Sequence, residues 1–329
     1  MTARGAGRTL PPPPMHRRIP RAVLAAFAAV LPIAGYAVYV WTGLPPRSEV
    51  RALATRNPGE TGLMRQRAAE TRRKGGKPRV VQAFVPLSRV SRFLIQAVVA
   101  AEDQRFFGHE GVDWEALQES LETNVERGRV ARGGSTITQQ LAKNLFFDTG
   151  RTLTRKLREL IVTRWMEEDL KKTRILTLYL NVIEWGDGIY GCEAAAFHWY
   201  GKSAQDLRPV EAAGLAAMIP NPRRINPGVS PARHERATRR VLWLMARAGY
   251  IERDVAGLGA EPPPEPAEEE EEAEEETTPP TPAVETPPGA ATPAPMDVSP
   301  LEPSPEPPPE PSPVPSLEPS PPTPTPPPG

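Results

Sequence analysis

Residues 90–111 read VSRFLIQAVVAAEDQRFFGHEG and determine how the rest of the chain is interpreted. Apolar residues recur at helical spacing along this segment, and Glu102 continues their row, so that its side chain is predicted to face the buried side. A carboxylate on a buried face without a permanent partner tends to have a raised pKa, which suits a general base or acid. The alternative is that Glu102 or Asp103 simply closes the helix in an ion pair with Arg105.

Three further segments favour the catalytic interpretation. Residues 133–144 read GGSTITQQLAKN, residues 151–159 read RTLTRKLRE and residues 172–181 read KTRILTLYLN. With the AEDQRFFGHEG run they resemble, in order, four motifs of glycosyltransferase family 51, the peptidoglycan glycosyltransferases. The resemblance extends over residues 80–250, approximately, and four motifs in the correct order make a chance match very unlikely.

The predicted secondary structure is helical throughout this region, with almost no strand alternation. The resemblance makes the expected all-α fold more specific: a lysozyme-like, two-lobed helical catalytic domain, with Gly133 and Gly134 giving backbone freedom to a mobile loop. Helices are expected near residues 90–103, 113–127, 136–145, 152–170, 172–184, 190–200, 204–217 and 231–249.

The resemblance also implies a reaction. Such enzymes polymerise lipid II into glycan strands by inverting glycosyl transfer, and they release undecaprenyl pyrophosphate in cell wall biogenesis. One carboxylate must then remove the proton of the acceptor 4-hydroxyl, a role we assign to Glu102. The leaving pyrophosphate is already a stable anion, so that it needs cations more than it needs an acid.

The matched family positions supply those cations and a second glutamate. Lys143 and Arg151 are expected to bind the pyrophosphate, with Arg155 and Arg158 nearby, because guanidinium groups match phosphate oxygens. Glu159 is expected to position these cations or the sugar. The alternative for Arg155 and Glu159 is an ordinary surface pair at i, i+4, worth about 0.3 to 0.5 kcal/mol.

The remaining candidate residues have supporting roles. As an alternative to substrate binding, Ser135 also suits the N-cap position of a helix. The predicted substrate-binding set is completed by Ser135, Thr136, Gln139 and Gln140, and the predicted structural set is Asp103, Phe106, His109 and Asn181. The sequence shows no convincing metal-ligand cluster; a divalent cation is the one candidate cofactor.

Charge is distributed unevenly along the chain, although the formal net charge is zero. Residues 1–46 carry arginines and no acidic residue, residues 47–258 are basic, and residues 259–329 are acidic and rich in proline. The basic middle suits an anionic substrate or membrane surface. The tail is predicted to be disordered, with cell-wall synthesis proteins as candidate partners. Cys192 is the single cysteine and excludes an intramolecular disulfide.

Residues 22–41 contain no charged side chain and follow a basic segment, residues 1–21. They are predicted to form an uncleaved signal anchor in the inner membrane, with a cytoplasmic amino end and an extracytoplasmic catalytic domain. A cleaved signal peptide is the alternative. Residues 42–79 are interpreted as a basic linker to a catalytic domain at residues 80–258.

Two other function classes stay open: a lysozyme-like glycan hydrolase, and a membrane-anchored scaffold without activity. The cations argue against hydrolysis, because that reaction has no pyrophosphate to bind. The intact glutamates argue against a scaffold. Thr177 departs from the family pattern, where many members have Glu, and no transpeptidase motifs follow, so a monofunctional enzyme is expected. The expected partners are lipid II, the nascent glycan strand and the bilayer, and no nucleic acid.

Overall fold

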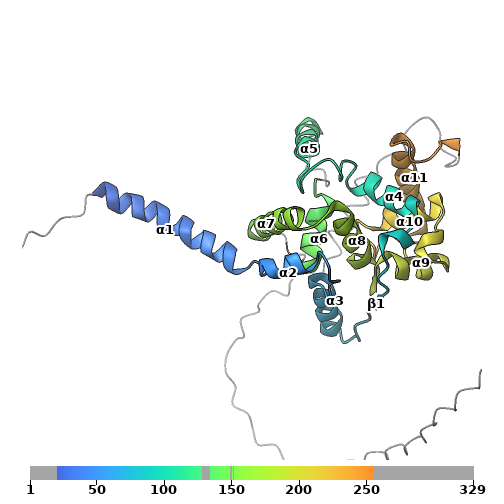
Figure 1. Cartoon of the computed structure of the whole chain (residues 1–329), viewed down its shortest axis with the longest axis horizontal. Coiled ribbons are helices and arrows are strands. Elements are labelled where there is room, and N and C mark those ends of the chain that lie inside the picture. The colour runs from blue at the N-terminus through green and yellow to red at the C-terminus, as the bar shows by residue number, and fades with distance from the viewer. Residues whose placement is uncertain (1–20, 128–133, 149, 151, 255–329) are drawn as a thin grey trace, which may run out of the picture. The chain divides into compact units, whose positions relative to one another are not determined.

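The computed structural model describes residues 21–127, 134–148, 150 and 152–254 (Figure 1). The predicted basic segment before residue 21, Gly133 and Arg151, and the acidic tail beyond residue 258 lie outside the described residues. Within the described part the chain is mostly helical, as the sequence predicts. The α-helices are α1 (Arg21–Thr42), α2 (Arg47–Ala52), α3 (Gly62–Arg73), α4 (Arg92–Glu102), α5 (Trp114–Arg127), α6 (Ile137–Phe146), α7 (Leu153–Asp169), α8 (Lys172–Val182), α9 (Cys192–Tyr200), α10 (Pro209–Met218) and α11 (Pro231–Arg247). Short 3₁₀ turns are η1 (Leu87–Arg89) and η2 (Ala204–Asp206).

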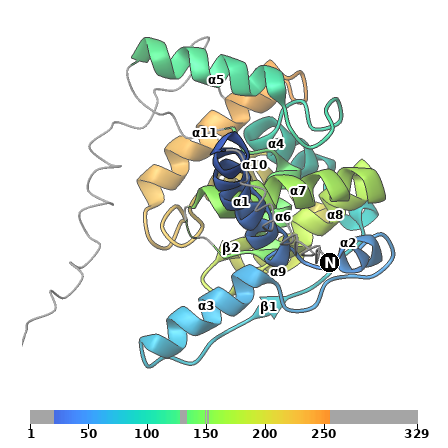
Figure 2. The same cartoon turned by 90° about the vertical axis from the view of Figure 1, so that its left-hand side faces the viewer.

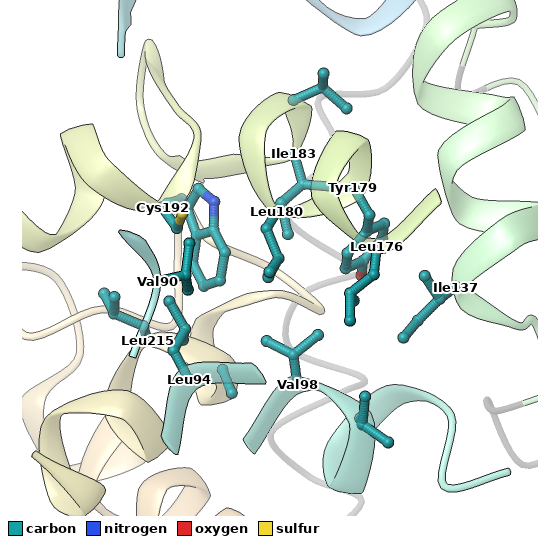
Figure 3. Packing of buried hydrophobic residues seen from close by; sticks show 14 of the residues in the cluster. Val90, Leu94, Val98, Ile137, Leu176, Tyr179, Leu180, Ile183, Cys192 and Leu215 are labelled. Carbon is teal, nitrogen blue, oxygen red and sulfur yellow. The ribbon is translucent and has the colours of Figure 1, made fainter. Parts of the chain in front are cut away.

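The core is a helical cluster in which α4 packs against α10 and α11, and α6 packs against α7 and α8. Leu94 and Val98 of α4, Ile137 of α6 and Leu180 of α8 are fully buried and belong to one apolar cluster, part of which Figure 3 shows. Cys192 lies in the same cluster, and burial raises the pKa of its thiol to about 12, so the cysteine is an inert packing residue. Figure 2 shows the same helices from the side.

Side-chain caps fix where the site-bearing helices begin. Ser91 precedes α4 and accepts a hydrogen bond from the amide of Phe93. Thr136 precedes α6 and Thr152 precedes α7, and each accepts a bond from the amide three residues ahead. These bonds satisfy amides that have no partner inside the helix. Ser135, for which an N-cap role was the alternative to substrate binding, lies one residue before the cap of α6.

A small sheet interrupts the helical pattern. Strands β1 (Val81–Gln82), β2 (Glu184–Gly186) and β3 (Ile189–Tyr190) pair in the order β1-β3-β2, with β1 parallel and β2 antiparallel to β3. Gly188 in the turn has a φ of +71°, and a Cβ there would meet the carbonyl oxygen of Arg79 at 2.6 Å. Strands of two and three residues are too short to give an alternating signal, which is why the sequence showed none.

Part of the segment interpreted as a linker is helical and packed. Val50 of α2 is fully buried within the main core, and Leu63 and Met64 of α3 form a second buried cluster with Tyr190. Thr61 caps α3 by accepting a hydrogen bond from the amide of Met64. Residues 47–73 therefore contribute to the folded part of the chain.

Helix α1 contains the predicted span 22–41, and its side chains are described from Val30 onward. In the described part of the chain, no helix is long and apolar enough to cross a membrane.

Candidate active site

Glu102 is the last residue of α4, and the row of apolar residues that precedes it is buried as predicted. Its carboxylate Oε2 accepts a hydrogen bond of 2.6 Å from the side-chain amide of Gln140 on α6. Burial raises the pKa of Glu102, against the opposing effects of the Gln140 bond and the charge of Lys143. The site thus holds a carboxyl group whose proton affinity is higher than usual, as general acid–base chemistry requires.

Gln140 is itself fixed from the opposite side. The hydroxyl of Tyr179, a fully buried residue of α8, donates a hydrogen bond of 2.9 Å to Oε1 of the Gln140 amide. Three helices therefore meet in the chain of bonds from Tyr179 through Gln140 to Glu102. Tyr179 stands in the motif at residues 172–181 but was not among the site residues predicted from the sequence.

Asp103 connects the end of α4 to the start of α6. Its buried carboxylate accepts a hydrogen bond of 3.0 Å from the amide of Ile137, the first residue of α6, and contacts Nε2 of His109 at 2.9 Å. The other ring nitrogen, Nδ1, accepts a bond from the amide of Gly111, so Nε2 carries the proton and donates to Asp103. Thr136 adds a third link by donating a 2.6 Å bond to the carbonyl of Gly111.

Arg105 does not pair with Glu102 or Asp103. Its guanidinium donates to both oxygens of Asp113, at 2.9 and 2.7 Å, and also contacts Glu115. The alternative prediction, an ion pair between Arg105 and Glu102 or Asp103 at the end of the helix, is therefore wrong.

One group of described residues has metal-ligand spacing: Asp103, His109 and Asp113 have ligand atoms within 4.8 Å of one another. Each of these atoms already has a hydrogen-bonding role. Asp113 accepts hydrogen bonds from Arg105 and from the amide of Ala116, and both ring nitrogens of His109 form the hydrogen bonds described above. The donor set is thus an internal network that holds the turn, and it fits a resident cation poorly.

Glu159 on α7 is the second carboxylate of the site, and only 3% of its side chain is exposed. Its two oxygens accept bonds of 2.7 Å from Arg155 and 2.6 Å from Lys156. Arg155 also donates to the carbonyl of Gly150. A buried carboxylate that holds two cations is not the surface pair that the alternative interpretation described.

Lys156 is a further site residue, which lies in the motif at residues 151–159 but was not among the predicted site residues. Besides Glu159, its ammonium group lies 3.2 Å from Ser135 Oγ and 3.2 Å from Gln139 Oε1. Lys156 directly follows Arg155 and stands three residues before Glu159, both of which were predicted site residues, and this position was the available signal. The ammonium joins α7 to the start of α6.

The charges of both carboxylates, Glu102 and Glu159, act on the ammonium group of Lys143. Burial lowers the pKa of its ammonium group, as do the charges of Arg155 and Lys156, whereas Glu159 and Glu102 raise it. The charges of both glutamates thus act on the same lysine. Lys143, Arg155 and Lys156 form a cluster of cations next to two carboxylates, and we call these three residues the cation cluster.

Arg158 points away from that cluster. It donates bonds of 3.0 and 2.5 Å to the carbonyl oxygens of Val40 and Tyr39, close to the carboxyl end of α1, and its guanidinium lies over the Tyr39 ring at 4.9 Å. A cation at this end of a helix satisfies carbonyls that lack a partner in the helix. Arg151 lies outside the described residues.

Phe106 and Asn181, the two other predicted structural residues, are buried and form contacts between the elements around the site. Phe106 is fully buried, and the ammonium group of Lys172 lies 4.5 Å from its ring centroid. Asn181 is fully buried and exchanges two hydrogen bonds with the backbone of Val85, accepting at 2.8 Å and donating at 2.9 Å. Asn181 thereby fastens the end of α8 to the segment that enters α4.

Known proteins are similar in sequence to this region of the chain. A family model described as Transglycosylase matches residues 70–246. The chain is 51% identical over 167 residues to the biosynthetic peptidoglycan transglycosylase of Dechloromonas aromatica, a match covering 51% of this chain and 72% of that protein. It is 44% identical over 232 residues to the protein of the same name from Azoarcus sp., covering 70% and 96%, and 45% identical over 224 residues to that from Bordetella pertussis, covering 64% and 88%.

Proposed function

The chain belongs to the transglycosylase family, and from this premise we propose that it is a peptidoglycan glycosyltransferase that polymerises lipid II into glycan strands and releases undecaprenyl pyrophosphate. The observation that supports this proposal best is the site itself. Glu102 is a half-buried glutamate of raised pKa, and its charge and that of Glu159 both act on Lys143. Glu159 in turn binds two further cations, Arg155 and Lys156.

The residues divide the chemistry between them. Glu102 takes the proton from the acceptor 4-hydroxyl as the oxygen attacks C1 of the donor sugar, and the bond from C1 to the pyrophosphate oxygen breaks. The electron pair of that bond leaves with the pyrophosphate. Because attack comes from the face opposite the leaving group, an α-linked donor gives a β-1,4 product.

The cation cluster of Lys143, Arg155 and Lys156 is proposed to receive the pyrophosphate. Its charges stabilise the negative charge that grows on the leaving oxygen, and they are fixed before the reaction starts. Glu159 keeps two of them in place. Arg151 belongs to this proposal from its family position, whereas the Arg158 guanidinium is bonded to α1 and is the weakest candidate in the set.

Polymerisation is tested with the full chain in detergent and labelled lipid II. A glycosyltransferase produces polymer and free undecaprenyl pyrophosphate. A hydrolase instead shortens preformed glycan, and a scaffold gives no turnover in either reaction. The Glu102→Gln variant is the control, because its amide keeps the shape of the side chain but cannot accept the proton. Polymer formation by that variant at the wild-type rate would remove the proposed base.

We also propose that residues 22–41 anchor the enzyme to the inner membrane and leave the catalytic part outside the cytoplasm. The support is the uncharged stretch after five arginines, together with the exposed Val30, Leu31 and Ile33 of α1. Deleting residues 1–44 should reduce activity on lipid II in bilayers far more than in detergent, because anchoring raises the effective concentration of substrate at the site. An equal effect in both media would contradict the anchor.

A further inference from the structure

The bonds behind Glu102 suggest a role for a residue outside the proposed reaction. Tyr179 donates to Oε1 of Gln140 at 2.9 Å, and Nε2 of the same amide donates to Glu102 Oε2 at 2.6 Å. We propose that Tyr179 is a positioning residue that fixes the orientation of the Gln140 amide, so that the amide always presents a donor to the catalytic carboxylate. This inference rests on the proposed function, in which Glu102 is the general base.

The side-chain amide of Gln140 could take either of two orientations, related by a flip of its oxygen and nitrogen. A side-chain amide has an acceptor on one side and donors on the other. Tyr179 is fully buried and belongs to the apolar cluster that also holds Leu176 and Ile137 (Figure 3). If the amide were flipped, its NH₂ group would face the Tyr179 hydroxyl, and the hydroxyl proton would lose its acceptor. Such a loss is costly for a buried hydroxyl.

The orientation of the Gln140 amide also affects the ionisation of Glu102. As oriented, the amide N–H stabilises the ionised carboxylate, the form that acts as a base. A flipped amide would place its oxygen against the carboxylate, and the two would be compatible only if Glu102 were protonated. Tyr179 thus opposes the effect of burial on Glu102 without touching the carboxylate or the substrate.

Tyr179 itself keeps its proton while Glu102 titrates. Burial, followed by the charges of Glu102 and Asp103, raises the pKa of the phenol well above its usual value. Among the described residues, the charged groups that influence Glu102 are Asp103 at the end of α4 and Lys143 on α6. In the described part of the chain neither residue forms a hydrogen bond with the Tyr179 hydroxyl, so removing the hydroxyl alters the hydrogen bonding of the Gln140 amide and not the local charge.

The test compares pH profiles of polymerisation by the full chain in detergent with lipid II. Gln140→Met removes the donor at similar side-chain length, and the acid limb of kcat/KM should move up by about one pH unit, equivalent to a tenfold loss at a fixed acidic pH. Tyr179→Phe should move it in the same direction. The double variant should shift no further than Gln140→Met alone, because both changes act on one bond.

Tyr190→Phe is the matched control, since it removes another fully buried tyrosine hydroxyl from the same folded region. Its acid limb should coincide with that of the wild type. A chemical-shift titration of the Glu102 carboxyl carbon in each variant, without substrate, measures the same pKa directly and does not depend on turnover.

The outcomes separate the two levels of the proposal. If Tyr179→Phe lowers the rate equally at every pH, or if its carboxyl titration matches the wild type, Tyr179 is only a packing residue and the inference is wrong. If the shifts of the two single variants add in the double variant, they act independently and the inference is also wrong. If Glu102→Gln still polymerises lipid II, the base assignment itself fails, whatever Tyr179 does.

Discussion

Replacing Glu159 by Gln removes one charge from the most buried ion-pair group of the site. The carboxylate is 3% exposed and accepts from Arg155, whose side chain is 16% exposed, and from Lys156, whose side chain is 38% exposed. An amide of the same shape can accept only one of these bonds and directs an N–H group at the other cation. The variant therefore keeps the volume of Glu159 and loses its function as an anion.

The magnitude follows from the exposure of the two partners. The bond to Arg155 is nearly buried and, as a charge-assisted hydrogen bond, contributes about 1.5 to 3 kcal/mol. The bond to Lys156 is screened by solvent and contributes less, up to about 1 kcal/mol. We expect unfolding free energy to fall by roughly 2 to 4 kcal/mol. For a domain of this size that corresponds to a Tm lower by roughly 5 to 15 °C.

A functional loss should accompany the loss of stability. Glu159 is the first of the charges that raise the pKa of Lys143, so the variant should lose the Lys143 proton at lower pH. The basic limb of the pH profile should move down, and kcat/KM should fall by about a hundredfold, comparable to the loss of one preorganised donor.

The assays are thermal unfolding followed by circular dichroism, and polymer formation between pH 6 and 9. Glu168→Gln is the matched control, because Glu168 lies on the same helix and also pairs with two cations, Arg47 and Arg164, but these three side chains are 37% to 57% exposed. Its Tm should fall by less than about 3 °C, as expected for a surface pair. Equal Tm values for the two variants, or an unchanged basic limb in Glu159→Gln, would refute the reasoning.

Three further predictions follow from the site. Burial raises the pKa of Glu102, so the unfolding free energy of the wild type should fall relative to that of Glu102→Gln as pH rises through that pKa. Thermal melts of both proteins from pH 4 to 8 measure this difference in stability, and a difference that does not change with pH would contradict the prediction. Lys143→Ala should weaken binding of lipid II, with a smaller loss at high salt, and equal loss at all salt concentrations would argue against a pyrophosphate contact. Arg158→Ala should speed proteolytic cleavage between α1 and α2, and unchanged cleavage would show that its bonds to Tyr39 and Val40 do not hold α1.

Much of the fold was accessible from the sequence because helix signals are local. Apolar spacing predicted α4 through α11 to within a few residues, with one predicted helix at 204–217 divided into η2 and α10 by Pro209. Helices α2 and α3 were not predicted, because their Arg-rich sequences resemble a solvated linker and only a few apolar residues reach the core. The sheet was missed since its strands are too short to show a period.

The candidate site was only partly accessible in the same way. Its carboxylates and most of its cations stand in motifs that can be found along the chain. Lys156 and Tyr179 stand in the same motifs but were not selected from the sequence, because their roles depend on what lies opposite them on another helix. Arg158 stands in the same motif as Lys156, yet it faces α1, because neighbouring residues on a helix point in different directions.

The sequence by itself determined that this chain is helical, that it carries a basic middle segment, and which motif residues are candidates for chemistry. Those properties depend on spacing, composition and charge, all of which can be counted along one chain. Only the tertiary structure decided which candidates meet. Glu102, Gln140 and Tyr179 come from three helices, and burial, which raises the pKa of Glu102 and lowers that of Lys143, arises only when those helices pack together.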